Sequence, residues 1–137
     1  IVLLVFCSHI RSIVYLGRRI LRRMRSAPGR RLILAFPGQG TQYVGMGRSL
    51  YRDSTAAKHV FETANEALGM SLTNLMFEGD PEILKRTENA QPAILVHSVA
   101  ALAMLNERTG FNVDASTCES VMGHSLGEYT ALVAANV

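Results

Sequence analysis

Short apolar runs alternate with longer helical patterns along residues 32–137 of this chain. The run Leu32–Phe36 is continuously apolar and stops at Pro37, which is typical of a strand buried on both faces. Cys118–Gly123 reads as a second short strand, and residues 129–137 after it have the pattern of a helix. The pattern therefore predicts two strands, the second of which runs into a helix.

The polar and apolar positions between these strands predict helices. In the first, residues 54–68, Ser54 can cap the beginning and Gly69 can end it. Residues 72–77 form a short helix or turn, and Asp80 followed by proline begins another that ends at about residue 85. The apolar face of the first helix is predicted to consist of Val60, Phe61, Ala64, Ala67 and Leu68.

The segment Ala93–Leu105 is almost wholly apolar, and its length favours a buried helix over a strand. His97 within it is predicted to be a packed, hydrogen-bonded core residue, whereas His59 is predicted to be solvated. The polar residues 106–117 connect this helix to the second strand. Strand, helices, strand and helix in this order predict an α/β fold with a parallel sheet.

Charge divides the chain in two. Residues 1–31 contain eight arginines and no acidic residue, whereas residues 32–137 contain six basic and eleven acidic residues. An arginine-rich, acid-free and partly amphipathic head is typical of an organelle transit peptide. The alternatives are a basic tail without a function and sequence upstream of a start at Met24. The turn-forming residues 26–29 indicate a linker, so the folded domain is predicted to begin at residue 32.

Composition excludes several other classes. The apolar stretch at the beginning of the chain is shorter and more polar than a membrane span of about 20 residues. The basic head carries no nucleic-acid recognition motif. The two cysteines, Cys7 and Cys118, suggest no disulfide framework, and the four histidines have no metal-ligand spacing. We therefore expect no metal, no bound cofactor, no nucleic-acid partner and no stable membrane insertion.

The residues Gly123-His124-Ser125-Leu126-Gly127 match G-x-S-x-G, the pattern of a nucleophile elbow between a strand and a helix. The glycines remove Cβ atoms that would collide with neighbouring backbone. Ser125 is then exposed at the end of the sheet, where the N–H of Leu126 and the positive end of the helix can stabilise an oxyanion. A glycine-rich turn that matches the pattern by chance is the alternative.

A second glycine-flanked loop, Gly38-Gln39-Gly40, follows the first strand. It is neither a G-x-G-x-x-G fingerprint, since Tyr43 replaces the third glycine, nor a P-loop, since Met46 stands where a lysine is needed. Active sites in parallel sheets lie at the carboxyl ends of the strands. The backbone N–H groups of Gln39 and Leu126 are therefore expected to flank Ser125.

Four linked motifs, which are Phe36–Gln42, Gly45–Gly47, Gln91–Ala93 and Gly123–Glu128, resemble the malonyl-CoA:acyl-carrier-protein transacylase family over about residues 32–137. The stretch 87–94 is most similar to the free-standing mitochondrial members. The resemblance implies a parallel-sheet, α/β-hydrolase-like acyltransferase core that ends before the ferredoxin-like subdomain of the family. Since the chain begins at Ile1 and ends within the last helix, we interpret residues 32–137 as an incomplete, N-terminal part of the domain.

The resemblance also implies a reaction. Ser125 would take a malonyl group from malonyl-CoA, and acyl carrier protein, through its phosphopantetheine thiol, would receive it in fatty-acid synthesis. Gln39 and Leu126 would form the oxyanion hole, Gln91 would line the substrate pocket, and His124 would have either a substrate role or a packing role under the elbow. The general-base histidine, an orienting glutamine and the malonate-binding arginine of the family would lie beyond residue 137. The location would be the mitochondrial matrix, with the cytoplasm as the alternative.

Three rival functions compete with this one. A serine esterase or thioesterase would share the elbow, but lipase-like enzymes use an oxyanion loop of a different type. An acyltransferase domain of a multifunctional fatty-acid or polyketide synthase would continue upstream into another catalytic domain, which the transit-like head argues against. A membrane- or partner-binding protein would require the elbow to be accidental.

Overall fold

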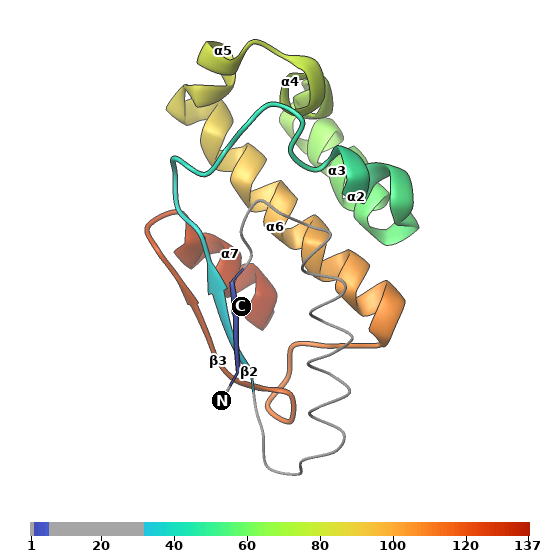
Figure 1. Ribbon diagram of the computed structural model, residues 1–137, viewed down its shortest axis with the longest axis vertical. Helices are drawn as coiled ribbons and strands as arrows, with labels where there is room; N and C mark the ends of the chain where they lie inside the picture. Colours follow the sequence, from blue (N-terminus) through green and yellow to red (C-terminus); the bar gives the residue numbers. More distant parts are fainter. Residues whose placement is uncertain (1, 6–31) are drawn as a thin grey trace.

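The computed structural model describes residues 2–5 and 32–137. In this part of the chain, three strands form one parallel sheet in the order β1-β2-β3 (Figure 1). The strands are β1 (Val2–Val5), β2 (Leu32–Phe36) and β3 (Cys118–Gly123). The predicted α/β fold with a parallel sheet is therefore confirmed, and β3 has the predicted bounds.

Strand β1 lies outside the domain boundary that the sequence predicted. It pairs in parallel with β2, from Val2 opposite Leu32 to Val5 opposite Ala35. An apolar, β-branched run can satisfy the backbone groups at the edge of a neighbouring strand. Residues 1 and 6–31, which hold the arginines and the predicted linker, lie outside the described residues, so their interpretation as a transit segment stays a prediction.

Burial along β2 alternates, which corrects the expectation of a strand buried on both faces. Leu32, Leu34 and Phe36 are fully or almost fully buried, whereas Ile33 and Ala35 keep partial exposure. Successive side chains of a strand point to opposite faces. One face of β2 therefore belongs to the core of the described part, and the other is only partly covered.

Helices α2 to α6 connect β2 to β3, and α7 follows β3. Ser54 Oγ accepts a hydrogen bond from the N–H of Ala57, as a cap does, and the Asp80 carboxylate caps the helix that begins at Pro81. The left-handed residue Gly69 ends the first long helix, so these predicted caps are confirmed. In the part of the chain that the structure describes, the helices are α2 (Arg48–Asp53), α3 (Thr55–Leu68), α4 (Leu72–Glu78), α5 (Pro81–Lys85), α6 (Thr87–Thr109) and α7 (Gly127–Ala135).

The predicted apolar face of α3 is only partly correct. Phe61 is buried and Val60 and Ala64 pack against the core, but Ala67 and Leu68 are exposed. The last turn of α3 extends past the end of the core, so its apolar residues have nothing to pack against in the described part. Sequence periodicity reports which residues share a face but not how far the neighbouring elements reach.

Helix α6 is longer at both ends than the predicted segment Ala93–Leu105. It begins at Thr87 and carries Pro92 inside it, and it ends at Thr109 with Gly110 in the left-handed conformation. A proline inside a helix removes one backbone hydrogen bond. Burial of the surrounding apolar side chains outweighs that loss, because tertiary packing supplies most of the stability of a helix.

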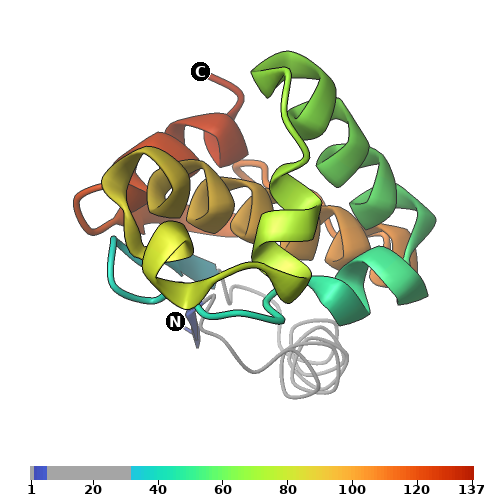
Figure 2. The ribbon, with the colours of Figure 1, turned by 90° about the horizontal axis from the view of Figure 1, so that it is seen from above.

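The long helix α6 lies at the centre of the molecule. Helix α7 packs against β2, β3 and α6, while α3 packs against another side of α6 (Figures 1 and 2). Helices α2 and α4 pack against α3 and also contact α6, and α5 packs against α6. Helix α6 contacts α7, which packs on the sheet, and it also contacts the helices α2 to α5. Its residues can therefore position the loops that leave the sheet.

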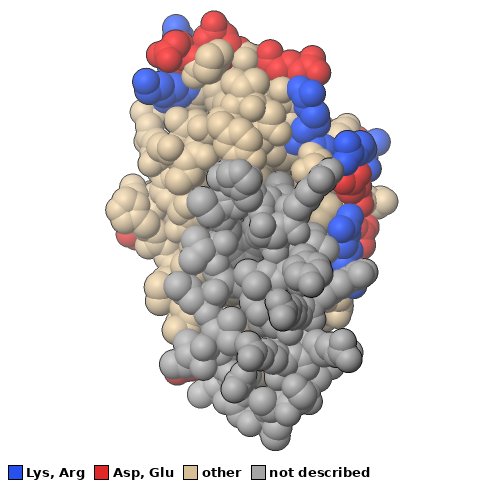
Figure 3. Space-filling view, viewed as in Figure 1, with Lys and Arg blue, Asp and Glu red and all other residues tan. Residues whose placement is uncertain are grey.

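The surface of the described residues carries mixed charge. In Figure 3, acidic and basic side chains lie together at the upper end and along the right-hand edge of the molecule, and the rest of the visible described surface is largely uncharged. Among the described residues, no helix combines the length and the hydrophobicity that crossing a lipid bilayer requires.

Candidate active site

The two predicted loops leave the sheet side by side. Phe36, the last residue of β2, is the register partner of Gly123, the last residue of β3. The pairing continues for one more step, because the N–H of His124 donates a hydrogen bond of 3.1 Å to the carbonyl of Phe36. The loop after β2 and the G-x-S-x-G turn therefore begin at the same edge of the sheet, as expected for a site at the carboxyl ends of parallel strands.

Ser125 has the backbone shape that the elbow pattern predicts. Its φ angle is 53°, and Asn136 is the other described non-glycine residue with a positive φ. L-residues adopt this left-handed region rarely, and they do so where the surrounding structure enforces it. The Ser125 side chain is exposed to solvent between the end of β3 and the beginning of α7.

Close backbone packing explains both glycines of the motif. A Cβ atom on Gly123 would lie 1.9 Å from the carbonyl carbon of Gly127. A Cβ atom on Gly127 would lie 2.3 Å from the carbonyl oxygen of Phe36. Neither neighbour can move aside, because each is backbone of the elbow or of the central strand. The elbow can thus form only with glycine at these two positions.

Two backbone N–H groups at this edge have no hydrogen-bond partner among the described residues. Those of Gln39 and Leu126 donate no hydrogen bond to any residue that the structure describes. Leu126 immediately precedes α7, so its N–H also lies at the positive end of a helix of nine residues. Such free donors are the components of an oxyanion hole.

The loop that carries Gln39 lies directly against the elbow. A Cβ atom on Gly38 would come within 2.6 Å of the carbonyl oxygen of His124 and 2.7 Å of its Nδ1 atom. The hydroxyl of Thr41 donates to the carbonyl of Gly38 over 3.0 Å, and the N–H of Gly40 donates to Gln42 Oε1 over 2.9 Å. These contacts hold the short loop in one shape and keep Gln39 next to the elbow.

The structure also brings Gln91 to this loop. Its Nε2 atom lies 3.5 Å from Gln39 Oε1, at the limit of a hydrogen bond. The amide of Gln39 donates in turn to the hydroxyl of Thr87 over 3.0 Å. The predicted residues Gln39 and Gln91 therefore meet, and Thr87 joins them. Sequence reasoning did not single out Thr87 as a site residue, because its contact with Gln39 joins residues 48 positions apart in the chain.

The described histidines do not reach Ser125 by a hydrogen bond. His124 is exposed, with its ring against Gly38, and His59 is exposed on α3, as predicted. His97 is buried on α6, as predicted, but its Nε2 atom has no partner among the described residues, which corrects the expectation of a hydrogen-bonded histidine. Burial lowers the pKa of His97 to about 4, so this ring is neutral at physiological pH.

Potential metal ligands do not gather in the described part of the chain. In residues 2–5 and 32–137, no group of three or more histidine, cysteine or acidic side chains is placed to hold a metal ion. The free cysteine in this part of the chain, Cys118, is buried at the beginning of β3.

Known proteins are similar to this chain. Residues 34–137 match the family described as "Acyl transferase domain". A malonyl CoA-acyl carrier protein transacylase of Bacillus subtilis (strain 168) is 49% identical over 105 residues, which are 77% of this chain and 31% of that protein. A probable mitochondrial malonyl-CoA-acyl carrier protein transacylase of Drosophila melanogaster is 48% identical over 104 residues, which are 76% of this chain and 27% of that protein.

Solved structures of malonyltransferases are also similar to this chain. The acyl-carrier-protein-S-malonyltransferase of Bartonella henselae has a TM-score of 0.68 and 46% identity, over 74% of this chain and 32% of that chain. A malonyl-transacylase in complex with its type II PKS acyl-carrier protein has a TM-score of 0.71 and 37% identity, over 79% of this chain and 33% of that chain. This chain spans about a third of the length of these proteins. It belongs to the acyl transferase domain family, and the resemblance to malonyl-CoA:acyl-carrier-protein transacylases is confirmed.

Proposed function

We propose that the protein to which this chain belongs transfers a malonyl group from malonyl-CoA to acyl carrier protein, through an ester on Ser125. The observation that carries the proposal is the left-handed Ser125, which two obligatory glycines hold beside the Gln39 loop. The names of the relatives support the choice of malonyl-CoA and acyl carrier protein as substrates.

In the first half-reaction, Ser125 Oγ attacks the thioester carbonyl of malonyl-CoA, and its proton passes to a general base. The carbonyl oxygen becomes an oxyanion that accepts hydrogen bonds from the N–H groups of Gln39 and Leu126. One such donor is worth roughly 10²–10³ in rate. The carbon–sulfur bond then breaks, coenzyme A leaves as its thiol after taking up the proton, and the malonyl group remains as a serine ester.

In the second half-reaction, the phosphopantetheine thiol of acyl carrier protein attacks the ester carbonyl. The base takes the thiol proton, the same two N–H groups stabilise the oxyanion, and the carbon–oxygen bond breaks. Ser125 recovers its proton, and malonyl leaves on the carrier. Thioester is exchanged for thioester, so the reaction needs no cofactor, metal or oxidant.

The base and the group that recognises malonate belong, in this proposal, to other parts of the protein. The relatives are about three times as long as the matched region, and no described histidine is hydrogen-bonded to Ser125. An arginine is suited to the free carboxylate of malonyl, because its planar fork donates two parallel hydrogen bonds. Gln91, which contacts Gln39, lines the substrate pocket in this proposal, and the exposed His124 lies against Gly38.

Peptide mapping of the full-length protein after incubation with malonyl-CoA tests the proposal. We expect malonyl on the peptide that contains Ser125, and we expect Ser125→Ala to abolish both labelling and transfer. Ser120→Ala is the matched control, because Ser120 is an exposed serine of β3 outside the elbow. Labelling of another residue, or full turnover by Ser125→Ala, would rule the mechanism out.

We also propose a mitochondrial location for this protein. The Drosophila relative is described as mitochondrial, and residues 1–31 of this chain carry eight arginines without an acidic residue. A synthase domain or a serine hydrolase would use the same elbow. Transfer to holo acyl carrier protein at a rate well above hydrolysis of malonyl-CoA would separate the transacylase from the hydrolase.

A further inference from the structure

Helix α7 is apolar over almost its whole surface, and Glu128 is its one charged residue. A helix on the surface of a folded protein normally carries charged and polar side chains on its solvent side, whereas a helix that is apolar all round is buried. Helix α3 has the usual arrangement, because its exposed side carries Lys58 and Glu62, which form an ion pair over 3.6 Å. The composition of α7 therefore indicates a helix that is covered on every side.

The residues that the structure describes cover one side of α7. Thr130 and Ala131 are buried where the helix packs against β2, β3 and α6. Tyr129, Leu132 and Val133, spaced three and four positions apart, share the opposite side and are 66%, 50% and 51% exposed. We call these three side chains the outer face of α7. Figure 2 shows α7 at the periphery of the molecule, beside α6.

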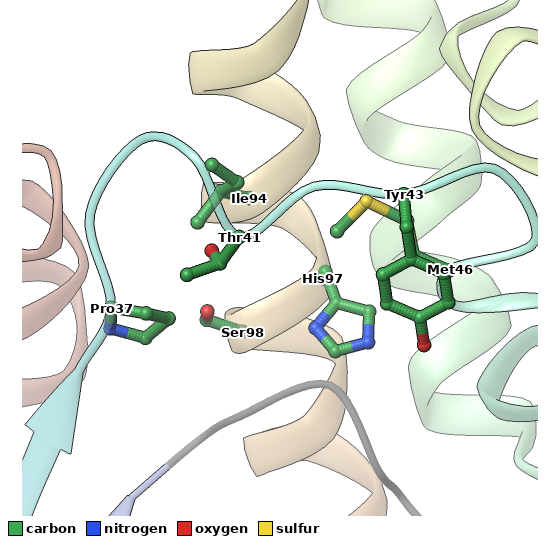
Figure 4. A pocket seen from close by; sticks show the side chains of 7 residues that line it. All are labelled: Pro37, Thr41, Tyr43, Met46, Ile94, His97 and Ser98. Carbon is green, nitrogen blue, oxygen red and sulfur yellow. The ribbon is translucent and has the colours of Figure 1, made fainter. Parts of the chain in front are cut away.

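Helix α6, whose middle part is also apolar, is enclosed by its neighbours. Helices α3 and α7 pack against it. The loop between β2 and α2 lies against it as well, where Ile94 and His97 of α6 line one small cavity together with Pro37 and Thr41 of the loop (Figure 4). Equivalent cover for the outer face of α7 has to come from outside the described residues.

We propose that the outer face of α7 is a docking surface for the remaining part of the same polypeptide. About two-thirds of each relative lies outside the region that matches this chain, which is ample to cover a helix of nine residues. Strand β3, against which α7 packs, is also the last strand of the described sheet, so its free edge offers the same part of the polypeptide backbone groups to pair with.

Two other occupants fit this surface less well. A stable dimer buries about 800 Å² on each partner. Nine helical residues extend only about 13 Å, so the outer face of α7 is a small part of such an interface. Acyl carrier protein, in the proposed function, would leave after each turnover and expose an apolar face that favours aggregation. The rest of the polypeptide is always present and covers the face permanently.

The first test compares the same substitution at two leucines of the full-length protein. Leu132 on the outer face of α7 and Leu68 at the end of α3 are 50% and 46% exposed in the described part. If the outer face is covered, Leu132→Gln buries an amide without a partner, and the unfolding temperature should fall by about 5 °C or more. Leu68→Gln is the matched control and should change it by less than about 2 °C. A change for Leu132→Gln as small as that expected of the control would overturn the proposal.

The second test uses the parent protein, so it does not depend on whether a variant folds. Nitration by tetranitromethane, followed by peptide mapping, measures the accessibility of the Tyr129 ring. In the full-length protein, purified without acyl carrier protein, Tyr129 should react about tenfold more slowly than in the unfolded chain, and at the same rate at every protein concentration. Reaction as fast as in the unfolded chain would show that the face is open and would overturn the proposal.

The same measurement separates the other occupants. Protection of Tyr129 that disappears on dilution would assign the outer face of α7 to a second copy of the protein. Protection that appears only after acyl carrier protein is added would assign the face to that partner. Either result would overturn the proposal. Because neither test uses enzyme activity, absence of malonyl transfer would contradict the proposed function and leave the docking surface intact.

Discussion

Phe36 and Gly123 are paired in the parallel ladder, and each is the last residue of its strand. This single register step places the Gln39 loop and the Ser125 elbow next to each other. The next hydrogen bond, from His124 to Phe36, extends the ladder into the elbow itself. The carbonyl of Phe36 also approaches Gly127, so the end of β2 contacts both arms of the turn.

The first prediction concerns Gly127→Ala. The new Cβ atom would meet the Phe36 carbonyl oxygen at 2.3 Å, so either the elbow or β2 must shift. We expect the free energy of unfolding to fall by about 3 kcal/mol, the upper end of what overpacking usually costs, and malonyl-ester formation to be lost. Urea unfolding and labelling of the full-length protein measure the two effects.

Gly69→Ala is the control for that substitution. Gly69 also has a positive φ, of 63°, but no atom of a neighbouring group lies within 4 Å of the position that a Cβ atom would take there. Only backbone strain of about 1–2 kcal/mol applies at this residue, and ester formation should persist. Equal losses of stability and of labelling in the two variants would show that steric contact with β2 does not shape the elbow.

The second prediction concerns Thr87→Val, which preserves side-chain shape but removes the acceptor of the Gln39 amide. The hydrogen bond of 3.0 Å between them is solvent-exposed, so overall stability should change by less than about 1 kcal/mol. Gln39 should then become more mobile, and kcat for malonyl transfer should fall several-fold. Thr55→Val is a suitable control, because Thr55 is an exposed residue at the beginning of α3. An unchanged kcat in Thr87→Val would indicate that the hydrogen bond from the Gln39 side chain to Thr87 does not fix the position of the Gln39 backbone N–H.

The third prediction is a pH dependence of stability from His97. Burial lowers the pKa of this histidine from 6.5 to about 4, so between these values the unfolded chain binds a proton that the folded chain does not. Its contribution to stability is therefore fully present above about pH 6.5 and is lost as the pH falls towards 4. The loss amounts to about 3 kcal/mol at most.

Unfolding measured between pH 4 and pH 7 in His97→Gln should show a smaller decline of stability on acidification than the parent protein. His59→Gln should decline as the parent does, because His59 is exposed. A parallel decline in the parent and in His97→Gln would mean that His97 does not stay neutral in the folded protein.

Local chemistry made much of the site predictable. A cap depends on one side chain and the next few N–H groups, so Ser54, Gly69 and Asp80 were correctly assigned from sequence. The elbow depends on backbone close contacts that only glycine permits, so Gly123 and Gly127 predicted the sharp turn at Ser125. The order of strands and helices then placed the Gln39 loop at the same edge of the sheet.

The features that sequence did not predict depend on distant partners. Helix α2 was not anticipated, and its Tyr51 packs edge-on against Phe61 and Phe77 of two other helices. The contact of Thr87 with Gln39 joins residues 48 positions apart. The unpaired Nε2 of His97 likewise depends on what surrounds it in the core, which no local pattern encodes.

The fourth prediction concerns the head of the chain. Residues 1–31 fused to a fluorescent reporter should direct it to mitochondria, and replacing Arg18, Arg19, Arg22 and Arg23 by glutamine should leave it in the cytosol. The first residue of the mature protein, read by terminal sequencing, should lie at or after Arg18. A mature protein that retains Val2–Val5 would instead show that β1 is a permanent strand of the sheet and that the head is not removed.

The last prediction is that residues 32–137, expressed alone, do not transfer malonyl to holo acyl carrier protein at a useful rate. A serine hydroxyl is a weak nucleophile unless a base takes its proton, and no described histidine hydrogen-bonds to Ser125. The isolated piece should also aggregate, because the apolar side chains of Leu132 and Val133 on α7 are 50% and 51% exposed. Gel filtration and a transfer assay, with the full-length protein as reference, measure both properties. A soluble, monomeric piece as fast as the full-length protein would mean that the base lies within residues 32–137.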